Sequence, residues 1–379
     1  MKIFYLVDDN QDFNVNIEIR KNNNNFFNIF NKDNLTKAKT EIDNYENKKW
    51  NQSKKNIHKF EYIYTSSNNS KNISNINPIS RSFFKLYEIL KDIEIKLENE
   101  SLICCICEGP GGFIQCINDN YKINNIYGIT LINKDNVNIP YWHNRIINNL
   151  KNNIFISSDG KSDIYNYDTI HEFINYILKN NKDGIHLVTS DGGFDYSENY
   201  NNQEISSYQL LFCEIYINLN IQRIGGNFII KFFDLFNYST IQLIYLLSKC
   251  YSDIIIFKPS FSRISNSEKY IIFRNFHGIS KENLNILKDN FNNYKEIFLD
   301  VPLDFINKIN EYNNIYVLNQ CKEINNIIEN IKNNRIIYHP SKEQINNAIQ
   351  WCHKYEIPIN YKCIYLKNNK DIINDNEKI

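Results

Sequence analysis

GGNFIIKFFDLF, residues Gly225 to Phe236, has the composition of a fully buried β-strand, because aromatic and β-branched residues follow a Gly-Gly break. Lys231 is the exception within this run. Removing an ammonium from water costs several kcal/mol unless partners compensate it. Burial also lowers the pKa of a lysine, which allows it to act as a base. We therefore expect Lys231 to have a functional role or to take part in a structural ion pair.

Apolar runs alternate with helical patterns around this strand. Shorter apolar runs fall at 102–107, 126–131 and 185–190. This alternation predicts an α/β fold with a mostly parallel sheet and helices on both faces. The strands expected at 253–258 and 269–276 are joined by a connection too short for a helical crossover. They therefore predict an antiparallel pair, which makes the last strand of the sheet antiparallel.

Three helices are predicted around these strands. Their ranges are 82–98, 204–224 and 238–251. The first has Ser80 or Ser82 as a cap, and Lys85 points away from its apolar stripe. We place Gly225 at the C′ position that closes the second helix.

The composition predicts three parts of the chain. Residues 1–78 form a polar N-terminal extension that ends in a flexible linker rich in Asn, Lys and Ser. Residues 79–278 form the alternating core, and residues 279–379 form a mainly helical C-terminal lobe.

Charge and cysteine usage limit the class of protein. The 43 basic and 43 acidic residues create no global field for nucleic acid, so a polyanion site must be a local patch. Nine cysteines include the apolar run ICCIC, which indicates reduced core thiols in an intracellular compartment. The sequence has neither a secretory h-region nor a stretch of membrane-spanning length. The seven histidines show no paired ligand spacing, so we expect no metal.

Two glycine turns follow expected strands. EGPGGF, residues 108–113, and SDGGF, residues 190–194, both lie at the carboxyl edge of the sheet, where nucleotide-like ligands bind. EGPGGF lacks the residues of a phosphate loop or a dinucleotide fingerprint, and its glycines permit close approach of a small zwitterion. Steric need alone also explains such glycines, and Asp191 alone could cap a turn.

Five segments in one order resemble the FtsJ-type RNA 2′-O-methyltransferases, and within them the mRNA cap ribose methyltransferases. They are EGPGGF, SDGGF, QLLFCE at 209–214, GGNFIIKFFDLF, and KPSFSRISNSEKY at 258–270. Single short motifs match by chance, whereas five in register make coincidence improbable. The resemblance covers about residues 79–276 and implies a Rossmann-like fold that uses S-adenosyl-L-methionine.

This resemblance implies a tetrad of Lys85, Asp191, Lys231 and Glu268, with Lys91 as an alternative to Lys85. Lys231 would accept the proton of a ribose 2′-hydroxyl while a sulfonium methyl is held in line behind it. Lys85 would lower the pKa of Lys231 by like-charge repulsion, and Asp191 and Glu268 would position the ammonium. Such chemistry requires no metal.

The resemblance also implies ligand contacts. The residues expected around S-adenosyl-L-methionine are Glu108, Gly109, Pro110, Gly111, Gly112, Phe113, Asp163 and Asp191. Asp163 matches an acidic position that contacts adenosine, with Asp159 or a plain exposed acidic loop as alternatives.

For the RNA, Ser262, Arg263 and Asn266 are expected to orient the backbone, with Arg263 gripping phosphate in a bidentate fork. A simple turn is the alternative. Glu198 and Asn199 lie where cap enzymes contact the guanine edge, although the local spacing departs from the family there.

The expected function is 2′-O-methylation of the first transcribed nucleotide of capped RNA. Alternatives are a ribosomal or transfer RNA methyltransferase, and a catalytically silent RNA-binding subunit of a capping or transcription complex. We expect a soluble protein of the cytoplasm or nucleus, or of a viral factory if the source is viral.

Overall fold

The computed structural model describes residues 2–6, 13–21, 26–123, 125–133, 135–136, 139–150, 153–193 and 200–367. Contacts divide the chain into two compact units of three segments each. The first unit comprises residues 1–32, 96–258 and 267–316, and the second comprises residues 33–95, 259–266 and 317–379. The division into three parts at residues 78 and 278 stays a prediction.

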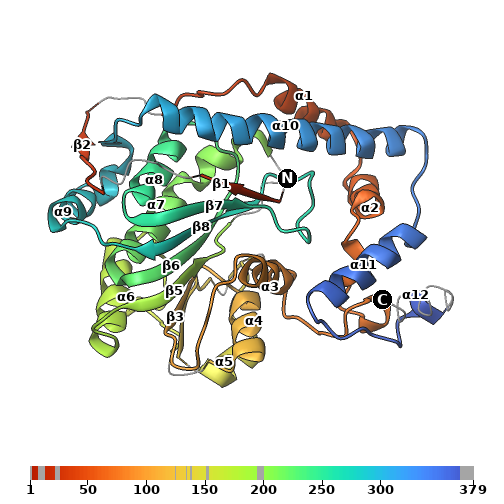
Figure 1. Cartoon of the computed structure of the whole chain (residues 1–379), viewed down its shortest axis with the longest axis horizontal. Helices are drawn as coiled ribbons and strands as arrows, with labels where there is room; N and C mark the ends of the chain where they lie inside the picture. The colour runs from red at the N-terminus through yellow and green to blue at the C-terminus, as the bar shows by residue number, and fades with distance from the viewer. Residues whose placement is uncertain are drawn as a thin grey trace. The chain divides into compact units, whose positions relative to one another are not determined.

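A seven-stranded sheet with the order β1-β7-β8-β6-β5-β3-β4 forms the centre of the first unit (Figure 1). Its strands are β1 (Ile3–Tyr5), β3 (Ile103–Ile106), β4 (Ile126–Ile129), β5 (Ile185–Ser190), β6 (Gln222–Phe232), β7 (Tyr251–Phe257) and β8 (Lys269–Phe276). The neighbours β4, β3, β5 and β6 run parallel, whereas β8 is antiparallel to both β6 and β7. The expected mostly parallel sheet with an antiparallel last strand is confirmed.

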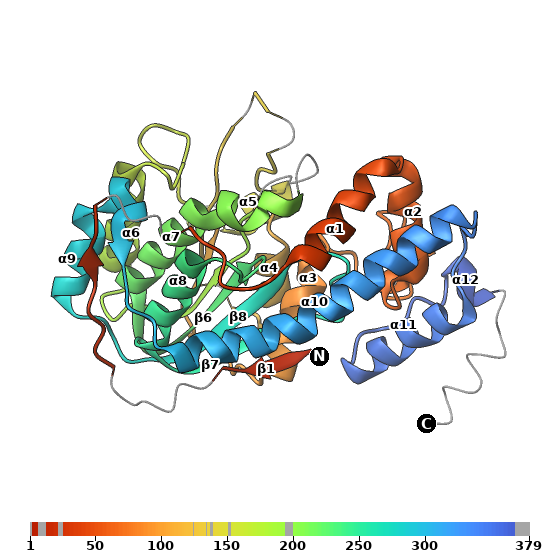
Figure 2. The ribbon, with the colours of Figure 1, turned by 90° about the horizontal axis from the view of Figure 1, so that it is seen from above.

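Helices flank this sheet on both faces (Figures 1 and 2). They include α4 (Gly112–Tyr121), α5 (Asn144–Leu150), α6 (Tyr167–Asn180), α7 (Gln203–Ile221), α8 (Tyr238–Ser248) and α9 (Lys281–Asp289). Helix α7 packs on β5 and β6, and α8 packs on β7. A small second sheet pairs β2 (Glu18–Ile19) with β9 (Ile297–Phe298). Because both faces of the main sheet are covered, β6 is buried from Phe228 to Ile230, as its composition predicted.

The strand that carries Lys231 begins earlier than predicted. Helix α7 ends where β6 starts at Gln222, so Gly225 lies inside the strand with a φ of 78°. The register with β5 shifts between Ile185 and Leu187, which marks an irregular stretch of β6 next to this glycine. Placing Gly225 at a helix C′ position was therefore wrong, because a positive φ suits a strand irregularity as well as a helix end.

Strand β1 was not expected from the sequence. Residues Ile3–Tyr5 pair antiparallel with β7 and extend the sheet by one short edge strand. A run of three residues is too short to give a clear alternating pattern.

The second unit is mainly helical. Its helices are α1 (Asp33–Glu41), α2 (Asn47–Ile57), α3 (Ser82–Asp92), α11 (Lys342–Lys354) and α12 (Ile364–Lys367). Helix α10 (Leu303–Lys332) contributes its residues up to Tyr316 to the first unit and its later residues to the second.

The segment 66–78, expected to be a flexible linker, has defined contacts within the second unit. The Asn72 side chain accepts hydrogen bonds from the amides of Thr65 at 2.9 Å and Ser66 at 3.2 Å. Ile73 is fully buried, and Ser74 forms a β-bridge with Ile359. The linker prediction was wrong because polar Asn and Ser side chains here satisfy backbone groups of a folded loop.

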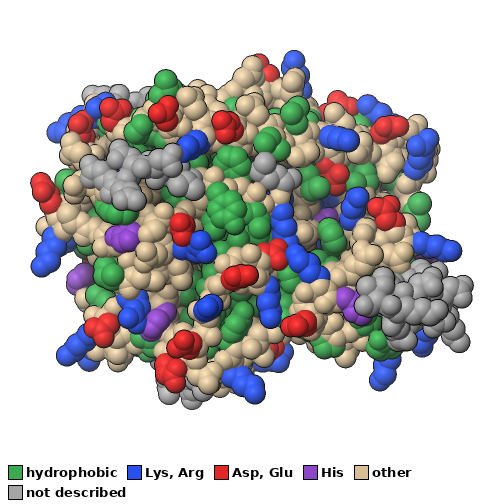
Figure 3. Space-filling model, in the orientation of Figure 1, with side chains coloured by type: hydrophobic (Ala, Val, Ile, Leu, Met, Phe, Trp, Pro, Cys, Tyr) green, Lys and Arg blue, Asp and Glu red, His purple; other side chains and the backbone are tan. Residues whose placement is uncertain are grey.

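Acidic and basic side chains are interspersed over the face shown in Figure 3, in keeping with the balanced composition. Within the ranges given above, no helix is both long and apolar enough to cross a membrane.

Candidate active site

The carboxyl ends of β5 and β6 lie next to each other in the first unit. Ser190 pairs with Ile230, so the residues that follow, Asp191 and Lys231, share one edge of the sheet. On its other side, Lys231 pairs with Tyr270 of the antiparallel strand β8. The register thus brings together the two tetrad members predicted at these strand ends.

Lys231 and Asp191 form a close ion pair. The ammonium lies 3.2 Å from Oδ1 of Asp191 and also donates to the Asp191 backbone carbonyl at 2.7 Å. The two side chains are only 11% and 13% exposed, so the pair is largely shielded from bulk water. A buried pair of this kind depends on good geometry, which the double contact supplies.

The charge on Lys231 is stabilised by its surroundings. Burial is the largest single influence and lowers the pKa of Lys231, but the carboxylates of Asp191 and Glu268 outweigh it and raise the pKa above its ordinary value. This direction is opposite to the lowering expected from the sequence. Lys231 is therefore held as an ammonium by the acids of its own unit.

Tyr270 is a site residue that the sequence analysis did not single out. Its hydroxyl donates a hydrogen bond of 2.8 Å to Oδ1 of Asp191, and its side chain is fully buried. Burial and the neighbouring Asp191 charge raise the pKa of Tyr270, which keeps the hydroxyl protonated as a donor. The motif NSEKY contained this tyrosine, but only the strand register reveals its partner.

Glu214 is a second residue that was missed. It is 1% exposed on α7, and its Oε1 lies so close to Gly192 that a Cβ on that glycine would be 2.3 Å away. Burial raises the pKa of Glu214 to about 8, and the opposing Lys231 charge limits the rise. An acid within the apolar run LLFCEIYI was the signal that could have identified it.

Glu268 precedes β8 and is partly buried. Its charge is the second carboxylate influence on the pKa of Lys231, which places it within electrostatic range of the ammonium. Its backbone carbonyl accepts a hydrogen bond of 2.5 Å from Lys258.

The glycine turn packs tightly at the end of β3. A Cβ at Gly109 would lie 2.3 Å from the Pro140 carbonyl oxygen, and one at Gly111 would lie 2.5 Å from Ile146. Gly111 also has a φ of 111°, a conformation that favours glycine. Packing therefore requires glycine at these two positions, and their contact with a cofactor stays a prediction.

Glu108 is buried beneath this turn. Its carboxylate accepts hydrogen bonds from the amides of Phe113 at 2.6 Å and Ile114 at 3.3 Å, at the start of α4. Burial raises its pKa well above the ordinary range, although the Phe113 amide opposes this rise. Glu108 thus satisfies the N-terminus of the helix, and its contact with a cofactor stays a prediction.

Asp163 and Asp159, the two acids considered for the adenosine contact, lie in different surroundings, and the choice between them stays a prediction. Asp163 is partly buried, and its charge contributes to raising the pKa of the Cys107 thiol, although burial is the main cause of that rise. Asp163 therefore lies near the end of β3. Asp159 is exposed and accepts hydrogen bonds within its own loop, from Ser157 at 2.5 Å and the Lys161 amide at 2.9 Å.

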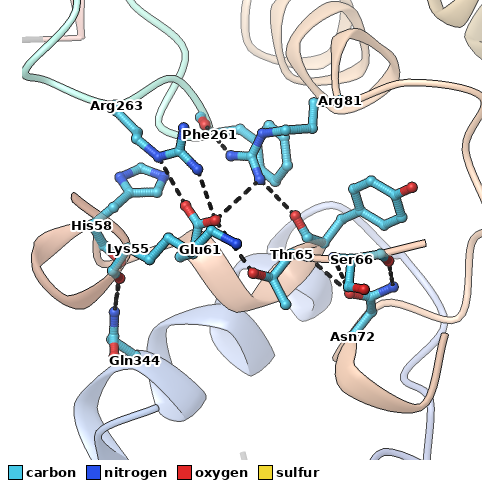
Figure 4. Close-up of polar contacts among 11 residues, drawn as sticks. Lys55, His58, Glu61, Thr65, Ser66, Asn72, Arg81, Phe261, Arg263 and Gln344 are labelled. Carbon is cyan, nitrogen blue, oxygen red and sulfur yellow. Dashed lines mark hydrogen bonds and ion pairs between the residues drawn. The ribbon is translucent and has the colours of Figure 1, made fainter. Parts of the chain in front are cut away.

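Arg263 lies in the second unit, where its guanidinium forms an ion pair with Glu61 (Figure 4). Two nitrogens of Arg263 donate to the carboxylate of Glu61 at 3.0 and 2.8 Å, and Arg81 lies 3.5 Å from the same carboxylate. Glu61 is fully buried. The bidentate fork predicted for RNA phosphate is thus formed with a protein carboxylate.

Other predicted residues also lie in the second unit. Ser262 is buried, and its hydroxyl lies 3.3 Å from Oδ1 of Asn266, which is exposed. Lys85 is partly buried on α3, and its place in the tetrad stays a prediction. Glu198 and Asn199 lie outside the described residues. Among the residues that the structure describes, no group of three or more metal-ligating side chains occurs.

The sheet order, the glycine turn and the acid–lysine pair at the strand ends define a Rossmann-like methyltransferase. The family model of the FtsJ-like methyltransferases matches residues 78–276, and the chain belongs to this family. The resemblance found from five short segments is confirmed.

Curated relatives carry the name cap-specific mRNA (nucleoside-2′-O-)-methyltransferase 1. The mouse protein is 32% identical over 227 residues, which cover 56% of this chain and 26% of the mouse protein. The human protein is 35% identical over 175 residues, which cover 44% of this chain and 20% of the human protein. The match thus spans about a quarter or less of these relatives. A solved ribosomal RNA methyltransferase of Plasmodium falciparum aligns at 23% identity with a TM-score of 0.38, over 53% of this chain and 99% of that one.

Proposed function

We propose that this chain transfers a methyl group from S-adenosyl-L-methionine to a ribose 2′-oxygen of RNA, on the first transcribed nucleotide of capped RNA. The Lys231–Asp191 pair at the carboxyl edge of the sheet is the observation that carries this proposal. Family membership supports the methyl transfer, and the names of the relatives support the cap as the target.

The residues at the sheet edge suit a cationic cofactor. Asp163 and Asp191 lie near the glycine turn, and one ammonium, Lys231, is paired with the acids around it. An excess of carboxylates attracts the two positively charged groups of the cofactor, its sulfonium and its amino group. When bound there, S-adenosyl-L-methionine supplies a sulfonium methyl group as the electrophile.

Lys231 acts as the base in this proposal. As the 2′-oxygen would take the methyl group from sulfur, its hydroxyl proton would move to Nζ of Lys231. Lys231 must be neutral to accept it, although the acids around it raise its pKa. A cation bound beside Lys231, together with Lys85 as a second ammonium, would disfavour the charged form. Asp191 and Glu268 would then keep the amine oriented.

Arg263 can serve RNA only by exchanging partners. A phosphate has the same bidentate geometry as the Glu61 carboxylate, so the two anions would compete for one guanidinium. Ser262 and Asn266, on the same loop, remain our candidates for further backbone contacts. Glu198 and Asn199 remain our candidates for the cap guanine.

The test is a methyl-transfer assay with labelled S-adenosyl-L-methionine and three acceptors: cap 0 RNA, the same RNA uncapped, and ribosomal or transfer RNA. The modified nucleotide is mapped by digestion and mass spectrometry. We expect transfer to the first nucleotide of the capped RNA alone. Transfer to the uncapped or structural RNA would contradict the cap assignment, and absence of both transfer and cofactor binding would favour a silent RNA-binding subunit.

The variant Lys231→Ala should lose methyl transfer by about 10²-fold or more while calorimetry still detects cofactor binding. Lys288→Ala, at the exposed last turn of α9, is the matched control. Retained activity in Lys231→Ala would exclude the proposed base. We also propose that the protein acts beside the capping or transcription machinery, in the nucleus or cytoplasm.

A further inference from the structure

Two lysines of the first unit are buried without a place in the proposed tetrad. Lys258 is 8% exposed directly after β7, and Lys269 is 1% exposed at the first position of β8. Buried ammonium groups persist only where hydrogen bonds and charge compensate them. Lys258 precedes Glu268 by ten residues, and Lys269 follows it directly in the chain.

Both ammonium groups hold backbone carbonyls around Glu268. Lys258 donates to the carbonyl of Glu268 itself at 2.5 Å. Lys269 donates to the carbonyl of Phe233, just beyond the end of β6. Lys258 therefore ties the Glu268 carbonyl to the end of β7, and Lys269, the next residue in the chain, ties the start of β8 to the end of the Lys231 strand.

Tyr316 of α10 contacts both of these lysines. The Lys269 ammonium is 4.2 Å from the centre of the Tyr316 ring, a short cation–π contact in a buried place. The Lys258 ammonium is 3.5 Å from the Tyr316 hydroxyl and 5.6 Å from its ring centre. One aromatic side chain thus contacts both groups that anchor the Glu268 backbone.

Tyr316 lies outside the part of the chain that matches the family, which ends at residue 276. Its neighbour Tyr312, one helical turn earlier, stacks on it with ring centres 5.6 Å apart. Tyr312 makes only a longer contact of 5.9 Å with Lys269, and its hydroxyl has no hydrogen-bond partner in the described part of the chain. The two tyrosines therefore share burial and helix but differ in what they touch.

We propose that Tyr316 is a positioning residue for the methyl transfer: by contacting Lys258 and Lys269 it fixes the backbone of Glu268, and thereby the carboxylate that acts on Lys231. This inference rests on the proposed function. Through Tyr316, α10, a helix outside the residues that match the family, would help to position Glu268 and thereby Lys231. Loss of this restraint would weaken the influence of Glu268, so Lys231 would lose its proton at a lower pH.

The test compares Tyr316→Leu, Tyr312→Leu and Tyr316→Phe in the full chain. Each is measured for thermal unfolding, cofactor binding, KM for capped RNA, and kcat as a function of pH. Tyr316→Leu should lower the kcat plateau by about 10-fold, less than the loss of a whole acid–base group because Lys231 itself stays in place. It should also move the acidic limb of the pH profile down by about half a pH unit or more. Its KM should change little. Tyr316→Phe keeps the ring over Lys269 and should recover most of the rate.

Tyr312→Leu should lower thermal stability about as much as Tyr316→Leu does. It should leave the acidic limb of the kcat–pH profile unchanged. A folded Tyr316→Leu with the wild-type limb, or an equal shift in Tyr312→Leu, would overturn the inference. If Tyr316→Leu does not fold, Lys258→Met takes its place, with the same expected shift and the same refuting result. A wild-type chain without methyl transfer would instead refute the proposed function, so the two failures are distinct.

Discussion

Replacing Tyr270 by phenylalanine removes one hydroxyl from the centre of the candidate site. That hydroxyl donates at 2.8 Å to Oδ1 of Asp191, the same oxygen that lies 3.2 Å from the Lys231 ammonium. A hydrogen bond to a charged group contributes about 1.5 to 3 kcal/mol to stability, and the phenyl ring keeps the volume of the fully buried side chain. We expect Tyr270→Phe to lower the free energy of unfolding by about 2 kcal/mol.

A double-mutant cycle isolates this contact. The free energy of unfolding is measured by urea denaturation for wild type, Tyr270→Phe, Asp191→Ala and the double variant. If the hydroxyl acts through the carboxylate, the coupling energy should be about 1.5 kcal/mol or more, because Tyr270→Phe has little left to remove once Asp191 is gone. A coupling below about 0.5 kcal/mol would refute the reasoning, since this is the range of independent sites. The measurement does not depend on enzymatic activity.

Four other substitutions test contacts within the first unit, at Gly192 and Glu214, and within the second unit, at Glu61 and Glu343. Gly192→Ala would place a Cβ 2.3 Å from Oε1 of Glu214, so we expect urea denaturation to show a loss of about 1 to 3 kcal/mol, and unchanged stability would contradict the packing. Glu214 has a raised pKa of about 8 against 4.5, so the folded state binds more protons in this window and the protein loses stability as the pH rises through it. Glu214→Gln should therefore show a smaller loss than wild type between about pH 5 and about pH 8, and an equal loss would exclude this origin. Glu61→Ala should cost about 3 kcal/mol, because it leaves two arginines without their buried carboxylate. Glu343→Ala, which breaks an exposed pair at 3.4 Å, should cost less than about 1 kcal/mol, and similar losses for both variants would contradict this difference.

The sequence predicted the parts of the site that lie on regular strands. Lys231 stood out because it interrupts an apolar run, and Asp191 could be placed beside it because parallel strands end at one edge. The antiparallel pair β7–β8 followed from the length of its connection.

Partners that are distant in the chain could not be predicted in the same way. Arg263 meets Glu61 across 202 residues, and no local pattern identifies which acid a guanidinium will find. Tyr270 reaches Asp191 only through the register of β6 and β8. The raised pKa of Lys231 depends on a balance between burial and several acids, which needs their positions and not only their presence.

Local composition also misled in places. Gly225 indicated a helix end and lies in a strand, and the polar segment 66–78 indicated a linker and forms a folded loop. In both cases the residue type was compatible with two conformations, and contacts from elsewhere in the chain selected one.

The short strand β1 has a practical consequence. It covers the free edge of β7, whose residues Ile254 to Phe257 are buried and rich in isoleucine. A fragment trimmed to residues 78–276 would lack Ile3–Tyr5 and leave the backbone donors and acceptors of that edge open to pairing with another chain. Such a fragment should self-associate through β7, so shortened chains made for crystallisation or assay should retain Ile3–Tyr5.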